Sequence, residues 1–278
     1  MSVHSTSSED VSGRKPVSVP GLAAMRARGE RIAMLTCYDA AFAGVLDAAG
    51  VDVLLIGDSL GMVLQGHSST LPVTLQDVAY HTGCVSRAKP KALVMADMPW
   101  ASYQASCEQA YGNAAALMAA GAQMVKLEGG AWLVPTVEFL VSRGIPVCAH
   151  LGLTPQSLNV LGGYKVQGRG EAGEQLLADA RAMQEAGAGL VLVELIPSTL
   201  GKALTEALSV PTIGIGAGPH TSGQVLVLHD ILDVTPGKKA RFVKNYLAGS
   251  GSIQEAVANF VREVKSGAYP QAEHGFLD

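Results

Sequence analysis

The stretch VDVLLIGDSLG, residues 51–61, decides the fold. Five of its first six residues are apolar, and Gly57, Asp58 and Ser59 follow at once. An apolar run of this length is typical of a strand that is buried on both faces of a parallel sheet. We therefore expect a buried strand that presents a carboxylate and a hydroxyl at its carboxyl end.

Three later segments repeat this plan. KALVMADMPW places Asp97 after an apolar run, and GLVLVELIP does the same with Glu194. AQMVKLEGG places Lys126 and Glu128 near the end of the third segment. These two residues lie two positions apart and so face the same side of an extended strand. We predict that these strand ends converge on one divalent metal ion and one reacting carbon.

Strand candidates and helical patterns alternate along the whole chain. Eight candidates can be counted, at residues 31–39, 51–59, 91–99, 122–130, 145–155, 189–197, 210–219 and 224–232. This α/β alternation predicts a parallel sheet covered by helices, and eight strands favour a closed TIM (β/α)8 barrel, in which chemistry occurs at the carboxyl ends of the strands. An open doubly wound sheet is the alternative, although neither familiar nucleotide-binding glycine motif is present.

Other segments interrupt the alternation. Residues 1–18 are serine-rich, charged and aperiodic, so we expect a mobile tail, and 19–278 form a single barrel catalytic domain. Residues 62–74 are predicted to form a loop beside Asp58. Residues 154–173 hold five glycines and are predicted to form a loop long enough for a lid or a substrate clamp.

Composition excludes several classes of function. The net charge is −4 and no block of lysine and arginine occurs, which argues against nucleic acid as a partner. The four cysteines form no CxxC pair, so neither a thiolate zinc site nor a disulfide framework is indicated. No stretch has the apolar length of a membrane span or a signal peptide. We expect a cytoplasmic protein without a membrane partner.

Asp58, Asp97 and Glu128 form a set of oxygen ligands. Such a set suits Mg²⁺ and disfavours zinc. The alternative is that each carboxylate caps a helix or pairs with a lysine. Lys126 beside the metal would suit a substrate carboxylate, or it forms a structural salt bridge.

Two further residues have two open interpretations each. Glu194 follows a long apolar run, and a partly desolvated carboxylate can serve as a general base. It could equally be a capping carboxylate. His150, in CAHLGLTP, either orients the substrate or is a satisfied core histidine.

Two glycine motifs suggest other functions. GDSLG, residues 57–61, matches the nucleophile elbow GxSxG and the first block of GDSL-type esterases. An elbow needs a helix directly after Ser59, where we expect a loop, and the late Asp-x-x-His of those esterases is absent. GIGAGP, residues 214–219, is either a phosphate-binding turn or a tight packing turn.

Six motifs in this order resemble the ketopantoate hydroxymethyltransferase family: IGDSLGMVLQG, ADMPW, MVKLEGG, HLGLTPQ, VLVELIP and IGIGAG. The resemblance covers residues 17–274. It implies a TIM barrel of the phosphoenolpyruvate-utilising type, a homo-oligomer that is decameric in many members, and Mg²⁺. It also implies that methylene-tetrahydrofolate donates a hydroxymethyl group to α-ketoisovalerate, giving ketopantoate for pantothenate biosynthesis.

The resemblance also implies roles for single residues. Asp58 and Asp97 would hold Mg²⁺, and Glu128 would join the metal shell. Ser59 and Lys126 would contact the keto acid.

Glu194 would be the proton acceptor. Mg²⁺ chelated by the keto acid would stabilise an enolate, which then attacks the methylene carbon of the folate. One alternative is a Mg-dependent keto-acid lyase of the isocitrate-lyase type, although such enzymes usually carry a cysteine in a mobile loop and residues 159–173 contain none. The other is a ligand-binding barrel without turnover.

Overall fold

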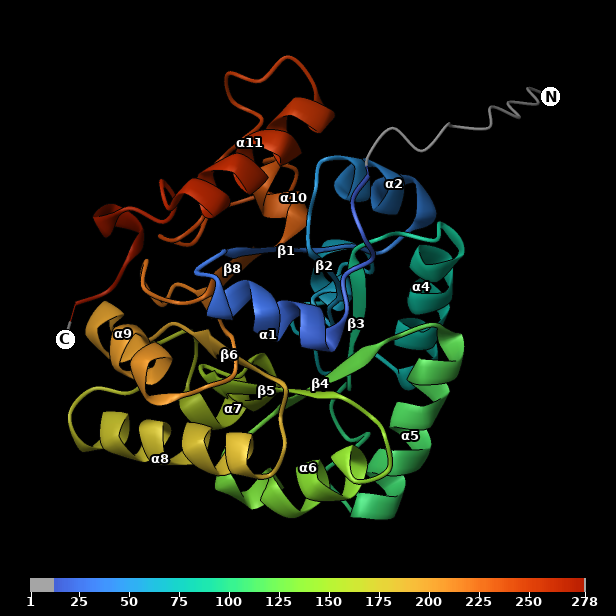
Figure 1. The fold of residues 1–278 in the computed structure, drawn as a ribbon, viewed down its shortest axis with the longest axis vertical. Coiled ribbons are helices and arrows are strands. Elements are labelled where there is room, and N and C mark those ends of the chain that lie inside the picture. The colour runs from blue at the N-terminus through green and yellow to red at the C-terminus, as the bar shows by residue number, and fades with distance from the viewer. Residues whose placement is uncertain (1–12, 278) are drawn as a thin grey trace.

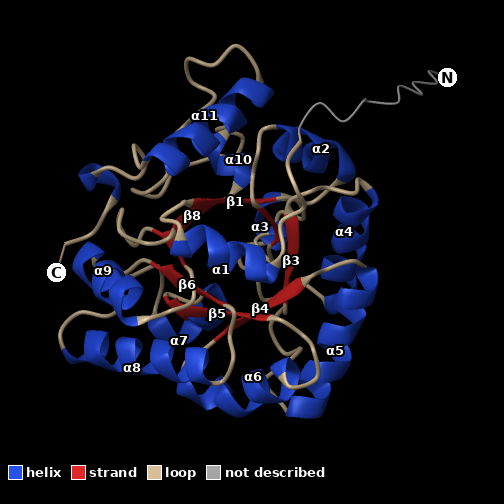
Figure 2. Ribbon diagram, in the orientation of Figure 1, coloured by secondary structure: helices blue, strands red, loops and turns tan. Residues whose placement is uncertain are grey.

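The computed structural model describes residues 13–277, in which eight parallel strands close into a barrel in the order β1 to β8. The strands are short and are surrounded by helices (Figures 1 and 2). Their bounds are β1 (Ile32–Thr36), β2 (Val53–Ile56), β3 (Leu93–Asp97), β4 (Met124–Glu128), β5 (Val147–Gly152), β6 (Leu190–Glu194), β7 (Thr212–Ile215) and β8 (Gly223–Leu226). Because β8 pairs with β1, the predicted TIM barrel is confirmed and the open sheet is wrong.

The helices follow the strands and cover the outside of the barrel (Figure 1). The longer ones are α1 (Val19–Ala27), α2 (Ala40–Ala48), α4 (Leu75–Arg87), α5 (Cys107–Ala120), α6 (Val134–Val141), α8 (Glu171–Glu185), α9 (Ser198–Ala207) and α11 (Ile253–Ser266). The short ones are α3 (Leu60–Val63), α7 (Leu158–Leu161), α10 (Leu228–Ile231) and the 3-10 turns η1 (Ala131–Leu133), η2 (Pro155–Ser157) and η3 (Ala272–His274). No helix in the described part of the chain is long and apolar enough to span a bilayer.

The inside of the barrel is packed with side chains at its amino-terminal end. Inward positions of all eight strands form one apolar cluster, to which Leu22 and Met25 of α1 also belong. Helix α1 lies across this end of the barrel (Figure 1). Because the amino-terminal end is filled and covered, a ligand can enter only from the carboxyl end.

Within a strand, the inward row changes from apolar to charged residues. In β3 this row is Leu93, Met95 and Asp97, and in β4 it ends with Lys126 and Glu128. Successive inward positions are two residues apart, as the geometry of a strand requires. The same alternation that buries the lower core therefore brings charged groups into the upper part of the barrel.

Helix α4 begins where the sequence predicts. The Thr74 side chain accepts a hydrogen bond from the backbone N–H of Asp77 at 3.1 Å, and Asp77 Oδ2 accepts one from the Thr74 N–H at 2.9 Å. This reciprocal capping box satisfies two backbone donors that would otherwise lack partners.

Three segments differ from the prediction. The eighth strand ends at Leu226, and Leu228 and Ile231 lie in α10, where both pack into the outer core. A short apolar run does not distinguish a strand from a buried helical turn. Residues 154–173 contain η2, α7 and the start of α8, so the irregular part is only 162–170. Helix α3 follows Ser59 directly, where we expected a loop.

The predicted tail, residues 1–18, lies mostly outside the described residues. Of its described part, Arg14 Nη2 donates to the Val51 carbonyl at 2.6 Å and lies 3.3 Å from Asp52 Oδ1. The Val17 N–H donates to the Lys91 carbonyl at 2.7 Å. These bonds attach this segment to the barrel, so the folded part begins before α1.

Candidate active site

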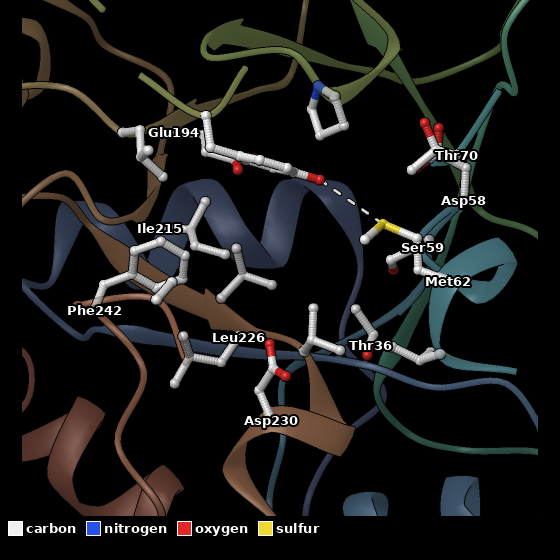
Figure 3. Close-up of a pocket in the computed structure, with 18 of the residues that line it drawn as sticks. Thr36, Asp58, Ser59, Met62, Thr70, Glu194, Ile215, Leu226, Asp230 and Phe242 are labelled. Atoms are coloured by element: carbon white, nitrogen blue, oxygen red, sulfur yellow. Dashed lines mark hydrogen bonds between the residues drawn. The ribbon is translucent and has the colours of Figure 1, made fainter. Parts of the chain in front are cut away.

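A cavity of about 1010 Å³ opens at the carboxyl end of the barrel. Its lining includes every candidate residue that the sequence indicated, namely Asp58, Ser59, Asp97, Lys126, Glu128, His150 and Glu194. Figure 3 shows Asp58 and Ser59 on one side of the cavity and Glu194 on the other. Four different strands and the segment after β2 thus bring these residues into one space.

Asp58 and Asp97 lie side by side. The Asp58 backbone N–H donates to Asp97 Oδ2 at 3.0 Å, and the two residues are 3% and 2% exposed. Burial, together with the charges of Asp97 and Glu128, raises the pKa of Asp58 well above its usual value. Burial also raises the pKa of Asp97, although Lys126 opposes this shift. Two carboxylates buried this close together can both be ionised only if a positive charge lies nearby.

Lys126 supplies part of this positive charge. Its Nζ lies 3.1 Å from Asp97 Oδ1 and 3.3 Å from Glu128 Oε1. Burial would lower the pKa of Lys126, but the charges of Asp97, Glu128 and Asp58 raise it well above its usual value. The lysine is therefore charged, and it links the ends of β3 and β4.

Both carboxylate oxygens of Glu128 have partners in the protein. Its Oε2 accepts a hydrogen bond from the backbone N–H of Gln156 at 3.0 Å, and its Oε1 faces Lys126 and, at 3.3 Å, His150 Nδ1. Burial alone would raise the pKa of Glu128, but Lys126 and His150 outweigh it and lower the pKa to about 2.

His150 lies between two glutamates. Its Nδ1 contacts Glu128, which is its partner in the β4–β5 register, and its Nε2 lies 3.3 Å from Glu194 Oε2. Burial and the charge of Lys126 favour the neutral ring, but Glu128 and Glu194 outweigh them, and the pKa of His150 is raised. Nε2 is buried and makes no well-aligned hydrogen bond to the described residues, which is unlike a satisfied core histidine.

The carboxylates can be tested against the ligand set that Mg²⁺ needs. Among residues 13–277, no three histidine, cysteine or carboxylate side chains are arranged to hold an ion between them. Mg²⁺ in proteins often takes only one or two carboxylates and completes its octahedron with water and substrate oxygens. Asp97 Oδ1 is buried and makes no well-aligned hydrogen bond, although Lys126 Nζ lies 3.1 Å from it, and Asp58 donates to the other oxygen of the same carboxylate. Two carboxylates, Asp58 and Asp97, fit such a site.

Sequence reasoning missed two buried residues, Gln156 and Tyr103. Gln156 Nε2 donates to Asp58 Oδ2 at 2.9 Å, and the Tyr103 hydroxyl donates to Gln156 Oε1 at 2.7 Å. Neither side chain is charged, so a search for acids at strand ends passes over them. The available signal for Gln156 was its place in HLGLTPQ, directly after the expected strand 145–155, although β5 ends four residues earlier, at Gly152.

Ser59 does not have the surroundings of an esterase nucleophile. The short helix α3 follows it, as a nucleophile elbow requires, so our argument from a loop at this position was wrong. However, the Ser59 hydroxyl lies 2.9 Å from the Tyr38 hydroxyl, and no histidine of the described residues is bonded to it.

The GIGAGP motif forms a packing turn. A Cβ at Gly218, where φ is 81°, would lie 2.5 Å from the side chain of Ser198. A Cβ at Gly201 in α9 would lie 2.2 Å from the Ala217 carbonyl. The glycines thus allow the turn after β7 and helix α9 to approach each other, which favours the packing alternative over a phosphate site.

Several solved structures have a similar fold, and one of them is described as a member of the PEP mutase/isocitrate lyase superfamily. 2,3-Dimethylmalate lyase, described as a member, has a TM-score of 0.53 and 19% identity over 71% of each chain. Phosphonopyruvate hydrolase, solved with oxalate and Mg²⁺, has a TM-score of 0.60 and 13% identity over 93% of each chain. At these identities the likeness shows the fold alone, which is the closed eight-stranded barrel described above.

Comparison of sequences goes further. The family model described as ketopantoate hydroxymethyltransferase matches residues 16–272. A Burkholderia lata protein named 3-methyl-2-oxobutanoate hydroxymethyltransferase 2 is 61% identical over 266 residues, which cover 95% of this chain and 98% of its own length. A Paraburkholderia phymatum protein named 3-methyl-2-oxobutanoate hydroxymethyltransferase is 61% identical over 264 residues, covering 95% and 97%. The chain therefore belongs to the ketopantoate hydroxymethyltransferase family.

Proposed function

We propose that this protein transfers a hydroxymethyl group from methylene-tetrahydrofolate to 3-methyl-2-oxobutanoate (α-ketoisovalerate), giving ketopantoate for pantothenate biosynthesis. The family match supports the reaction class. The observation that carries the proposal is that two adjacent buried carboxylates, the charged Lys126, His150 and the candidate base Glu194 line one cavity.

Asp58 and Asp97 would hold Mg²⁺ directly. Glu128 would support the site through water, because both of its oxygens already accept contacts from the protein. When bound, Mg²⁺ would polarise the ketone of the keto acid and make the adjacent C–H more acidic. Two carboxylates leave most of the octahedral positions to water and substrate oxygens.

Lys126, His150 and Ser59 would hold the keto acid. The buried charge of Lys126 offsets the negative charge of the keto-acid carboxylate. His150 Nε2 lies 3.3 Å from Glu194 Oε2 without a well-aligned hydrogen bond, and it can donate to a substrate oxygen. The Ser59 hydroxyl, oriented by Tyr38, can donate to the same carboxylate. These groups fix the substrate relative to Glu194, and fixed geometry lowers the entropic part of the barrier.

Glu194 would be the general base. It ends β6, it is 9% exposed, and it faces Asp58 across the cavity (Figure 3). Its carboxylate would take the proton from the carbon next to the ketone. That carbon then bonds to the folate methylene carbon, whose bonds to folate nitrogen are broken. Water supplies the hydroxyl group and one proton, and this proton and the one taken by Glu194 go to the two folate nitrogens. Keto acid, methylene-tetrahydrofolate and water thus give ketopantoate and tetrahydrofolate.

The cavity has room for a second substrate. Its volume of about 1010 Å³ is at the upper end of the range for drug-sized ligands, whereas the keto acid is far smaller. One group of its lining residues forms an apolar wall that includes Leu195, Ile215, Phe242 and Phe276. This wall suits the flat ring system of a folate.

Two alternative activities have less support. The lyase named among the solved structures is 19% identical and shares the fold, whereas the relatives at 61% identity are named hydroxymethyltransferases. An esterase would need a histidine beside Ser59, where Tyr38 lies instead.

A turnover assay with 3-methyl-2-oxobutanoate and methylene-tetrahydrofolate tests the proposal. We expect ketopantoate to form with Mg²⁺, to stop forming with EDTA and to form again when excess Mg²⁺ is added. Asp97→Asn is the matched variant, since it keeps the shape of the side chain and removes the charge. Turnover that EDTA leaves unchanged would contradict the role of the metal, and absence of ketopantoate under all conditions would contradict the proposed reaction.

The cytoplasmic location and the homo-oligomeric, decameric assembly expected from the sequence stay predictions. Light scattering on the purified full-length chain measures the assembly directly.

A further inference from the structure

Gln156 makes five polar contacts just beyond β5, the longest of them from Gln104 Nε2 to its Oε1 at 3.4 Å, and it is only 7% exposed. Its Nε2 donates to Asp58 Oδ2 at 2.9 Å and to the Met98 carbonyl at 3.0 Å. Its backbone N–H donates to Glu128 Oε2 at 3.0 Å, and its Oε1 accepts from the Tyr103 hydroxyl at 2.7 Å. One residue thus joins the ends of β2, β3, β4 and β5.

The surrounding groups fix the orientation of the Gln156 amide. The Tyr103 hydroxyl accepts from the Glu128 backbone N–H at 3.1 Å, and its one hydrogen points to Gln156 Oε1, the shorter of its two acceptor contacts. The amide NH₂ then faces two acceptors, Asp58 and Met98. A flipped amide would place its oxygen against both acceptors and lose the hydrogen bonds to Asp58 and to Met98.

These contacts restrict the Asp58 carboxylate. Because Gln156 holds Oδ2, the carboxylate cannot rotate freely, and Oδ1 is left as the candidate ligand. The same residue holds Glu128 through its backbone. Groups behind metal ligands tune the affinity of many sites in this way.

We propose that Gln156 is a positioning residue, oriented by Tyr103, that holds Asp58 in the geometry needed to bind the divalent cation. This inference rests on the proposed function, in which Asp58 and Asp97 hold the ion. A purely structural role would make Gln156 matter for folding and leave the affinity for the ion unchanged. The two roles therefore differ in a measurable quantity.

The test is a titration of the full-length protein with Mn²⁺, an ion that binds to the same kind of oxygen ligands. The free ion is counted by electron paramagnetic resonance, without substrate and without turnover. We expect Gln156→Ala to bind Mn²⁺ about 10- to 100-fold more weakly than wild type, as for other residues behind metal ligands. We also expect saturating Mg²⁺ to restore much of the lost kcat.

Gln224→Ala is the matched control. Gln224 is 2% exposed, and its amide donates to the Gly218 carbonyl at 3.1 Å and to Thr221 Oγ1 at 2.8 Å. It is not among the described residues that line the cavity. Its loss should lower the unfolding temperature and leave the Mn²⁺ affinity as in wild type.

Tyr103→Phe keeps the inference testable where Gln156→Ala does not fold. This variant retains the Gln156 side chain but removes the hydroxyl that orients it, so we expect a smaller loss of Mn²⁺ affinity. If Gln156→Ala folds and binds Mn²⁺ with wild-type affinity, the inference is overturned while the proposed metal site stands. If Gln156→Ala does not fold, the same result for Tyr103→Phe overturns the inference. A wild-type protein that binds no Mn²⁺ would contradict the proposed metal site itself.

Discussion

At the scale of single residues, the site depends on charges that are buried together. Asp97, Lys126, Glu128 and His150 are all between 2% and 4% exposed. A buried charge is tolerated when partners offset its loss of hydration, and the removal of one partner leaves the others uncompensated. The electrostatics of this cluster therefore give two predictions.

The first concerns Lys126. In Lys126→Met, the carboxylates of Asp97 and Glu128 lose their shared cation, so we expect a loss of about 3–5 kcal/mol in the free energy of unfolding. Urea unfolding without added metal measures it. Lys202→Met is the control, because Lys202 is exposed and lies 3.9 Å from Glu206 on the surface of α9. The control should change stability by less than about 0.5 kcal/mol. Equal losses in both variants would be evidence against a compensated buried cluster.

The second concerns pH and Glu128. The folded-state pKa of Glu128 is lowered from 4.5 to about 2. Near pH 3–4 its side chain therefore carries a proton less often in the folded than in the unfolded protein. Its contribution to stability is thus fully present above pH 4.5 and is lost as the pH falls towards 2. We expect the difference in unfolding free energy between wild type and Glu128→Gln to shrink over this interval. Parallel stability curves for the two proteins would show that the pKa of Glu128 is not lowered.

At the scale of elements, the period of a strand explains why the sequence predicts much of the site. Asp97, Glu128 and Glu194 each end a buried strand, and parallel strands place such ends at one rim. Lys126 lies two residues before the end of β4 and faces the same side as Glu128. Gln156 lies in η2, beyond the strand, and has no charge to mark it. Its contact with Asp58 spans 98 residues, so nothing in the local pattern predicts it.

Some helix starts can be predicted from the sequence and others cannot. Thr74 is followed three residues later by Asp77, and this local signal gives the start of α4 correctly. Helix α10 has no such side-chain cap, and its apolar residues read equally well as a strand. A capping residue can be recognised in a sequence because its hydrogen bond is local. The packing of Leu228 and Ile231 in the outer core, which favours a helical turn there, cannot be recognised in this way.

The cap of α4 can be tested by itself. Thr74→Ala removes the side-chain acceptor for the Asp77 N–H, and we expect the free energy of unfolding to fall by about 1 kcal/mol. Thr74→Ser keeps a capping hydroxyl and should lie within a few tenths of a kcal/mol of wild type. Thermal or urea unfolding decides between them. If Thr74→Ala has the same free energy of unfolding as Thr74→Ser and wild type, the capping box does not contribute to stability.

At the scale of the whole molecule, the barrel separates stability from chemistry. Its amino-terminal end is filled with apolar side chains and covered by α1, and its carboxyl end opens into the cavity. The closed barrel was predictable from eight alternating units. The shape of the cavity was not, because Tyr164 and Phe242 enter it from segments without regular periodicity.

The central claim is that this cavity makes a keto acid give up a proton to Glu194. The most direct measurement is the exchange of the C3 hydrogen of 3-methyl-2-oxobutanoate with deuterium in D₂O, followed by proton NMR with Mg²⁺ and without folate. We predict that wild type catalyses the exchange and that Glu194→Gln, while still binding the keto acid, slows it by about 100-fold or more. Exchange by Glu194→Gln at the wild-type rate would contradict the account.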